Sequence, residues 1–289
     1  KTLSKIAMYG KLKTHLCNTL AEIKEAGLYK SERLIESPQQ AVIDVNGKEV
    51  LNFCANNYLG LSNHPRLIKA ASKMMEERGY GMSSVRFICG TQDIHKQLEE
   101  AISKYFHTED TILYAACFDA NGGVFEPLFT EEDAIISDAL NHASIIDGSR
   151  LSFSRSIKYA HNDMDDLRKK LSRLPEESAK LIVADGIFSM EGDLVNLPEI
   201  VKLADEFGAN IMMDDAHSLG VIGFNGAGTA SHFGLTDKVD LIMGTFSKSL
   251  ASLGGFIAAD EETIEFIKHR ARVLMFSASM PPGSVASVI

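Results

Sequence analysis

The sequence predicts an α/β fold with a mostly parallel central sheet and helices on both faces of that sheet. From residue 111 onward, short apolar runs that are typical of strands alternate with stretches of helical periodicity. Alternation of this kind usually produces parallel strands joined by crossover helices. With 289 residues, of which 45% are hydrophobic and 24% charged, the chain has the composition of a globular protein with a sizeable core.

The first 60 residues predict an N-terminal arm. Leu12, Leu16 and Leu20 share one stripe of a helix expected over residues 9–27. Two alternating runs around an Asn-Gly turn predict a hairpin over residues 41–53. We therefore expect an arm over residues 1–60, a large α/β domain over 61–275 and the start of a further domain over 276–289.

The large domain opens with two predicted helices, residues 65–78 and 92–106, and continues with the strand–helix alternation. The predicted strands are residues 111–115, 134–137, 180–185, 210–214, 241–243 and 256–259. Helices over 164–173 and 197–207 lie between them. Ligands of such sheets bind at the carboxyl ends of the strands, so the residues that follow each strand are the expected functional site.

Composition excludes several functions. A net charge of −10 with no evident basic face argues against a nucleic-acid-binding protein. The four cysteines are widely spaced without a C-x-x-C pair, so reduced thiols are expected rather than disulfides or a zinc site. No apolar run reaches the roughly 18 residues of a membrane span. A signal-peptide pattern is absent too, which predicts a cytoplasmic protein.

Lys248 is the first candidate for chemistry. It follows an apolar strand and stands in a small-residue segment, residues 244–255, that closes with two glycines. Burial disfavours an ammonium ion, lowers the pKa of the amine and makes it a nucleophile that forms Schiff bases with aldehydes such as pyridoxal 5'-phosphate (PLP). The alternative is a lysine at a strand end whose amine reaches solvent.

Asp214 is the second candidate. It ends an apolar strand, where a carboxylate is costly unless it meets a cation. A protonated pyridine nitrogen is such a cation. His217 follows closely enough to reach the phenolic oxygen of the same ring. Metal ligation by Asp214, Asp215 and His217 is the alternative, although no further carboxylate–histidine cluster accompanies them, and no metal is expected.

Three further strand ends carry suitable groups. Residues 116–123 are small and lead into a helix, which suits a phosphate, although many ordinary turns look alike. His142 can stack on a flat ring or be purely structural. Ser189 places a hydroxyl at the edge of the sheet. Taken together, an anion site, a stacking imidazole, a partner for pyridinium and an amine predict a PLP enzyme.

Five sequence segments identify the chain as similar to one family of PLP enzymes. They are residues 52–60, 84–91, 141–144, 214–217 and 244–248. These segments resemble the α-oxoamine synthases, which are fold-type I PLP-dependent transferases that condense an amino acid with an acyl-CoA, and the resemblance runs from about Met8 to the end.

The resemblance implies a role for each matching residue. Catalytic roles fall to Lys248, which forms the Schiff base with PLP, to Asp214, which pairs with the pyridinium nitrogen, and to His142, which stacks on the ring. The resemblance also implies that His217 contacts the ring oxygen of the cofactor and that further cofactor contacts come from Ser189, Thr245, Cys117 and Phe118. In a homodimer, Ser277 and Ala278 would reach the phosphate of the neighbouring subunit. Asn56 matches a position near the substrate carboxylate.

The two halves of the chain resemble different members of the family. Up to about Gly148 the segments are similar to the glycine C-acetyltransferases of threonine degradation, which use glycine and acetyl-CoA. From Arg150 onward they are more similar to bacterial serine palmitoyltransferases, which use serine and a long-chain acyl-CoA. Because the first half is expected to shape the acyl-CoA entrance, glycine and acetyl-CoA are predicted, with or without loss of CO2, and serine with a long-chain acyl-CoA is the alternative.

The end of the chain departs from the family pattern. Family members continue into a C-terminal α+β domain with an arginine that binds the substrate carboxylate, and that domain is expected to be largely absent from a chain that ends at Ile289. Two other functions remain open. One is an aminotransferase or lyase on the same fold, which needs no CoA. The other is a non-catalytic partner subunit, against which the presence of Lys248 argues.

Overall fold

The computed structural model describes residues 10–289, which fall into two compact units. The arm unit comprises residues 10–38 and 42–52, and the large unit comprises residues 39–41 and 53–289. The first residue of the predicted arm helix and the start of the resemblance at Met8 lie outside the described residues. The predicted division into residues 1–60, 61–275 and 276–289 stays a prediction.

The arm unit contains one helix and one hairpin, as expected. Helix α1 (Gly10–Glu25) buries none of its residues within this structure, and its leucine stripe is exposed. Strands β1 (Val42–Val45) and β2 (Lys48–Leu51) pair antiparallel around Asn46 and Gly47. Both turn residues have positive φ angles, 52° and 70°, which is the backbone of the tight turn that an Asn-Gly pair favours.

The large unit is built on a seven-stranded sheet with the order β3-β9-β8-β7-β6-β4-β5. Its strands are β3 (Asp110–Tyr114), β4 (Ala134–Asp138), β5 (Arg155–Tyr159), β6 (Lys180–Asp185), β7 (Asn210–Asp214), β8 (Leu241–Thr245) and β9 (Gly255–Ala259). Strands β4 to β8 run parallel, whereas β9 is antiparallel to both of its neighbours. Residues 246–254 are too few for a crossover helix, so β9 has to return beside β8 in the opposite direction.

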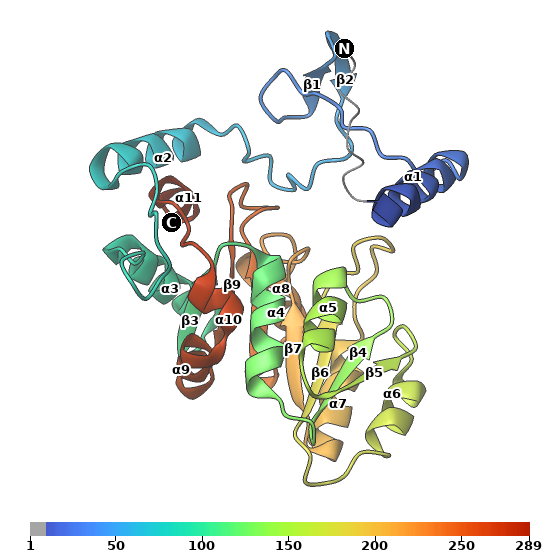
Figure 1. The fold of residues 1–289 in the computed structure, drawn as a ribbon. Helices are drawn as coiled ribbons and strands as arrows, with labels where there is room; N and C mark the ends of the chain where they lie inside the picture. Colours follow the sequence, from blue (N-terminus) through green and yellow to red (C-terminus); the bar gives the residue numbers. More distant parts are fainter. Residues whose placement is uncertain (1–9) are drawn as a thin grey trace. The chain divides into compact units, whose positions relative to one another are not determined.

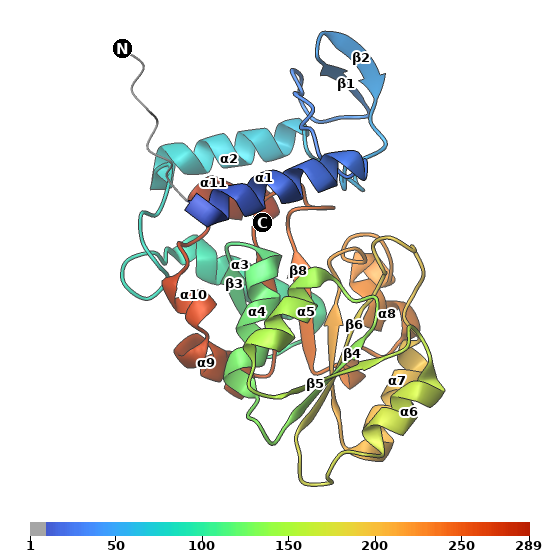
Figure 2. The same ribbon diagram turned by 45° about the vertical axis from the view of Figure 1, so that its right-hand side comes forward.

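Helices cover both faces of the sheet, as Figures 1 and 2 show. The helices of the large unit are α2 (Pro65–Arg78), α3 (Asp93–Phe106), α4 (Cys117–Leu128), α5 (Ala143–Leu151), α6 (Met164–Leu171), α7 (Leu197–Phe207), α8 (Gly228–Phe233), α9 (Glu261–Arg270), α10 (Arg272–Phe276) and α11 (Pro282–Val288). Helices α4 and α5 lie on one face, and α6 and α7 lie on the other. The predicted α/β fold with a mostly parallel sheet is confirmed.

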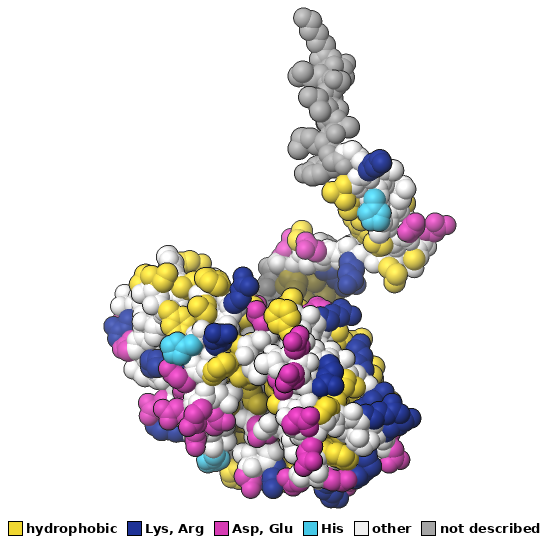
Figure 3. Space-filling model, turned by 60° about the horizontal axis from the view of Figure 1, so that its bottom comes forward, with side chains coloured by type: hydrophobic (Ala, Val, Ile, Leu, Met, Phe, Trp, Pro, Cys, Tyr) yellow, Lys and Arg dark blue, Asp and Glu magenta, His cyan; other side chains and the backbone are white. Residues whose placement is uncertain are grey.

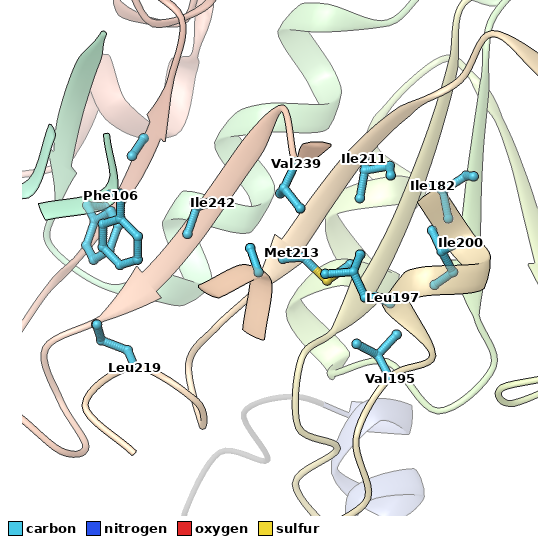
Figure 4. Packing of buried hydrophobic residues seen from close by; sticks show 14 of the residues in the cluster. Phe106, Ile182, Val195, Leu197, Ile200, Ile211, Met213, Leu219, Val239 and Ile242 are labelled. Atoms are coloured by element: carbon cyan, nitrogen blue, oxygen red, sulfur yellow. The ribbon is translucent and has the colours of Figure 1, made fainter. Parts of the chain in front are cut away.

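The core is divided by the sheet into two clusters, because side chains alternate along buried strands. On β6, Ile182 belongs to the cluster that contains Leu197 and Ile200 of α7. The neighbouring Val183 belongs to the cluster that contains Val124 of α4. Figure 4 shows the first cluster, where side chains of β6, β7 and β8 meet those of α7. Both faces of the central strands are thus closed, so the sheet offers a ligand only its strand ends.

The surface carries both signs of charge. On the face seen in Figure 3, lysine and arginine side chains are interspersed with aspartate and glutamate over the large unit. Cys17, Cys54, Cys89 and Cys117 form no disulfide, in agreement with the expected thiols. Among the helices of residues 10–289, none combines the length and the apolar character that a bilayer span requires.

Candidate active site

Asp214 ends strand β7 and is buried, with 4% of its surface exposed. Its Oδ1 accepts a hydrogen bond from the Ala216 backbone N–H (3.0 Å), and its Oδ2 accepts one from Asn121 Nδ2 (2.9 Å). Burial raises the pKa of this carboxyl group, and the two hydrogen bonds act against that rise. Among residues 10–289 no lysine or arginine forms an ion pair with Asp214, so the carboxylate is hydrogen-bonded but not neutralised.

Lys248 stands in the segment between β8 and β9, and its Nζ lies 2.7 Å from His217 Nε2. Burial lowers the pKa of the Lys248 amine, whereas the carboxylates of Asp214 and Asp185 and the nearby Cys117 act in the opposite direction. A lowered pKa increases the neutral fraction of the amine, which is the form that can act as a nucleophile or base.

His217 connects Lys248 to the loop before α2. Its Nδ1 lies 2.7 Å from the hydroxyl of Tyr58, and that hydroxyl donates to Asn56 Oδ1 over 3.1 Å. Burial lowers the pKa of His217 to about 4, so its ring is neutral at physiological pH. With the Tyr58 hydrogen directed to Asn56, Nδ1 of His217 donates to the Tyr58 oxygen and Nε2 accepts from Lys248.

His142 is the N-cap residue of α5, and its ring is exposed at the strand end. Its Nδ1 lies 2.7 Å from Ser144 Oγ and also accepts from the Ser144 backbone N–H at 3.3 Å. The ring of Phe118 stands edge-on to it, with 6.4 Å between the ring centres. A histidine held in this way has one nitrogen fixed by the protein and one face open to a ligand.

Asp185 is a second buried carboxyl group beside Asp214. The two residues are direct neighbours on the parallel strands β6 and β7, so their side chains leave the same face of the sheet. Asp185 accepts from the His142 backbone N–H over 3.3 Å. Burial, followed by the charge of Asp214, raises the pKa of Asp185 to about 8. Two such neighbours cannot both ionise readily, so the pair of Asp185 and Asp214 retains a proton near neutral pH.

Asp215 belongs to the framework rather than to the site. Its carboxylate accepts from the Ser218 hydroxyl and the Thr229 N–H, and it packs closely on Gly228, whose φ is 77°. Asp215 therefore ties the loop after β7 to α8.

The alternative of a metal site finds no support, because residues 10–289 contain no group of three or more histidine, cysteine, aspartate or glutamate side chains arranged to hold a metal.

The remaining predicted residues lie at different distances from this cluster. Cys117 and Phe118 begin helix α4, with backbone N–H groups at its N-terminus. Thr245 is buried, and its hydroxyl bonds Ser247 Oγ and the Gly254 carbonyl. In the described chain, Ser189, Ser277 and Ala278 form no hydrogen bond with the Lys248 cluster, and Ala278 instead bridges to Val85 in the loop before α3. Their predicted roles stay predictions.

Four residues of the site were not singled out from the sequence: Tyr58, Asn121, Ser144 and Asp185. Tyr58 and Ser144 stand inside segments that carry the family resemblance, next to residues that were assigned. Asn121 is a fully buried amide inside a helix, and such a group needs partners. Asp185 ends an apolar strand as Asp214 does, and the same argument about a buried carboxylate identifies it.

The family model for class I and II aminotransferases matches residues 48–289. The chain is also similar to individual curated proteins. The chain is 60% identical to a serine palmitoyltransferase of Sphingobacterium spiritivorum over 94% of this chain and 68% of that protein. It is 50% identical to the 2-amino-3-ketobutyrate coenzyme A ligase of Escherichia coli over 98% of this chain and 72% of that protein. The chain belongs to the α-oxoamine synthases.

Solved structures agree with this assignment. A lysine-to-alanine variant of the serine palmitoyltransferase from S. paucimobilis with a bound PLP–myriocin aldimine superposes with a TM-score of 0.89 and 32% identity, over 95% of this chain and 69% of that one. The α-oxoamine synthases are PLP-dependent, and the fold is that of the fold-type I transferases. The residues at the strand ends fit this cofactor, because Asp214 is a buried carboxylate in no direct ion pair within the described chain, and the nearby Lys248 is an amine with a lowered pKa.

Proposed function

We propose that this α-oxoamine synthase joins serine to a long-chain acyl-CoA and releases CoA. The observation that carries this choice is the 60% identity to a serine palmitoyltransferase, compared with 50% to a 2-amino-3-ketobutyrate coenzyme A ligase. The order of the two candidates is thus the reverse of the one favoured by the sequence segments alone. Glycine with acetyl-CoA stays the second candidate, and the glycine C-acetyltransferase-like segments up to about Gly148 favour it.

In this proposal the cofactor is held at both of its ends. Asp214 keeps the proton on the pyridine nitrogen, His142 stacks on the ring and His217 bonds the phenolic oxygen. The N-terminal N–H groups of α4, at Cys117 and Phe118, hold the phosphate. Further cofactor contacts in this proposal are Thr245 and Ser189, and Ser277 and Ala278 of a second copy in a homodimer. Asn56 lies within the hydrogen-bond chain of Tyr58 and His217, which supports a place near the substrate carboxylate.

Bound PLP supplies an electron sink that stabilises negative charge on the Cα atom of the amino acid. Lys248 would hold the cofactor, and its neutral amine would accept the Cα proton of the bound amino acid. The lowered pKa of Lys248 supports this role, since the amine has to be unprotonated to accept that proton. Cα would then bond to the carbonyl carbon of the thioester, the carbon–sulfur bond would break, and CoA would leave as the thiol with the proton that had been taken from Cα.

The test is CoA release by the PLP-loaded protein with two substrate pairs, serine with palmitoyl-CoA and glycine with acetyl-CoA. We expect release with the first pair. Release with the second pair alone would replace the proposal by its second candidate. Amino-group transfer from an amino acid to an oxoacid without CoA release would indicate an aminotransferase instead.

The variant Lys248→Ala tests the assignment of the base, with Lys202→Ala as the matched control. Lys202 is an exposed lysine of α7 that pairs with Glu199. We expect Lys248→Ala to lose the absorption band of covalently joined PLP together with turnover, and Lys202→Ala to keep both. Full turnover in Lys248→Ala would remove Lys248 from the mechanism.

A further inference from the structure

A chain of three hydrogen bonds connects Asp214 to His142. The Asn121 side chain donates from Nδ2 to Asp214 Oδ2 (2.9 Å) and to Ser144 Oγ (2.8 Å). Ser144 Oγ lies 2.7 Å from Nδ1 of His142. Asn121 and Ser144 are almost completely buried, with 0% and 1% of their surfaces exposed. Their side chains therefore have no competing water, and the bonds among them fix where each hydrogen lies.

The direction of these hydrogen bonds follows from the negative charge of Asp214. This step rests on the proposed function, in which Asp214 is the ionised partner of a pyridinium. An ionised carboxylate only accepts hydrogen bonds, so the NH2 group of Asn121 and not its oxygen has to face Asp214. The same nitrogen donates its other hydrogen to Ser144 Oγ. The hydroxyl hydrogen of Ser144 is then directed to His142.

Nδ1 of His142 is consequently an acceptor. It faces the Ser144 hydroxyl at 2.7 Å and the Ser144 backbone N–H at 3.3 Å, both of which are donors in this arrangement. A neutral imidazole carries one hydrogen, and with Nδ1 accepting, that hydrogen lies on Nε2. In the described chain Nε2 of His142 has no hydrogen-bond partner, and the ring is exposed.

We propose that Asn121 and Ser144 are positioning residues that transmit the charge of Asp214 to His142 and hold it as the Nε2–H tautomer. His142 then offers the substrate a hydrogen-bond donor, directed at a carboxylate or thioester oxygen, and not a base. In this proposal Asp214, which holds the proton of the cofactor, also determines which nitrogen of His142 donates a hydrogen bond to the substrate. Ser144 and Asn121 touch neither substrate nor cofactor in this role.

The experiment is nitrogen NMR of the PLP-loaded protein with 15N-labelled histidine, in which two-bond proton–nitrogen correlations distinguish the tautomers. The resonances of His142 are assigned by their loss in His142→Gln. We expect the Nε2–H form in the wild-type protein, with Nδ1 shifted as a hydrogen-bonded acceptor. In Ser144→Ala we expect Nδ1 to move toward the position of an unbonded nitrogen. We also expect kcat to fall about 3- to 10-fold, the size of one lost hydrogen bond.

Ser149→Ala is the matched control. Ser149 is a buried serine of the same helix α5, and its hydroxyl bonds the Ile146 carbonyl and Ser156. This variant should leave the His142 resonances and kcat unchanged, while Ser144→Thr, which keeps a hydroxyl, should restore the wild-type spectrum. An Nδ1–H form or an imidazolium in the wild-type protein at pH 8, or a Ser144→Ala spectrum equal to wild type, would overturn the proposal.

These outcomes separate the two proposals. CoA release from one of the substrate pairs together with an Nδ1–H histidine would leave the proposed function standing and remove the role of Asn121 and Ser144. The expected tautomer without CoA release from either pair would do the reverse. The tautomer is measured in the wild-type protein, and only the assignment of its resonances needs the His142→Gln variant, so a Ser144→Ala protein that fails to fold does not prevent the test.

Discussion

Two groups of buried charges in the large unit differ in what surrounds them. Glu99 of α3 is 2% exposed and meets two cations, with its Oε1 2.8 Å from Arg86 Nη2 and its Oε2 2.5 Å from Lys96 Nζ. Asp214 is buried to a similar degree but receives hydrogen bonds only from the neutral groups of Asn121 and Ala216. One carboxylate is neutralised within the protein, and the other is not.

The difference distinguishes framework from site. Removal of one partner of a buried ion pair destabilises the fold, because the other charge stays buried without compensation. Hydrogen bonds from neutral groups offset part of the cost of a buried carboxylate, as they do for Asp215 in the framework, and in our proposal a bound cation offsets the remaining cost at Asp214. Arg86 and Glu99 thus fix the loop before α3 onto that helix, while Asp214 is prepared for a ligand that brings positive charge.

Asp214→Asn should have the largest effect on activity. The amide cannot hold a proton on a pyridine nitrogen by charge, so we expect kcat to fall about 10²- to 10³-fold, as for loss of a main electrostatic contact. The cofactor-free protein should stay within about 1 kcal/mol of the wild-type free energy of unfolding, because loss of a buried charge offsets loss of a hydrogen bond. Urea denaturation without PLP and CoA release with PLP measure the two quantities.

Glu99→Gln should show the opposite pattern. The variant leaves the buried guanidinium of Arg86 without a counter-charge, and we expect the free energy of unfolding to fall by about 3 kcal/mol. The folded fraction should still bind PLP with the wild-type absorption spectrum, which a titration at low temperature measures. If Glu99→Gln were as stable as wild type, the distinction between the two groups of charges would fail.

Asp185→Asn should change the pH dependence of stability. The pKa of Asp185 is raised by burial to about 8 in the folded protein, whereas an unfolded aspartate has a pKa of about 3.9. Between these values the folded protein keeps a proton that the unfolded chain has released, so the free energy of unfolding falls as pH rises from about 4 to about 8. The variant should lose up to about 1.4 kcal/mol per pH unit of this slope.

Denaturation of the cofactor-free protein at several pH values between 5.5 and 8.5 tests this expectation, with Asp93→Asn as the control. Asp93 is an exposed carboxylate whose pKa is lowered by its hydrogen bond from Arg78, so its replacement should leave the slope above pH 5.5 unchanged. An identical slope in wild type and Asp185→Asn would show that another group carries the proton.

Lys96→Ala should have the smallest effect. Lys96 is more than half exposed, and Glu99 keeps Arg86 when Lys96 is removed. We expect the free energy of unfolding to fall by about 0.5 kcal/mol, as for exposed pairs in general. Thermal unfolding of Lys96→Ala and Glu99→Gln side by side separates the contributions of the two cations. A larger loss in Lys96→Ala than in Glu99→Gln would contradict the structural role given to Arg86.

The sequence predicted those parts of the molecule that a local pattern encodes. Strands β6 and β7 lie where apolar runs end in an aspartate, and the rule on strand ends pointed to Lys248 and His217, whose nitrogens lie 2.7 Å apart, and to Asp214, whose charge acts on Lys248. Strand β5 was not predicted, because Arg155, Ser156 and Lys158 interrupt its apolar pattern on an exposed edge of the sheet.

The contacts that complete the site could not be predicted in this way. Tyr58 and His217 are 159 residues apart in sequence, and Asn121 and Asp214 are 93 apart. No local pattern encodes such a pairing, since it depends on how helices and loops pack over the strand ends. The segment that holds Ser277 and Ala278 bonds to the loop before α3 for the same reason.

A comparison of PLP with its carbocyclic analogue, in which CH replaces the ring nitrogen, tests whether Asp214 binds the cofactor through that nitrogen. The two ligands differ in the one atom that Asp214 is proposed to hold, and calorimetric titration measures the affinity of each. We expect the wild-type protein to bind PLP about 10-fold or more tightly than the analogue, and Asp214→Asn to bind both alike. Equal affinities in the wild-type protein would show that the unpaired carboxylate of Asp214 does not serve the cofactor.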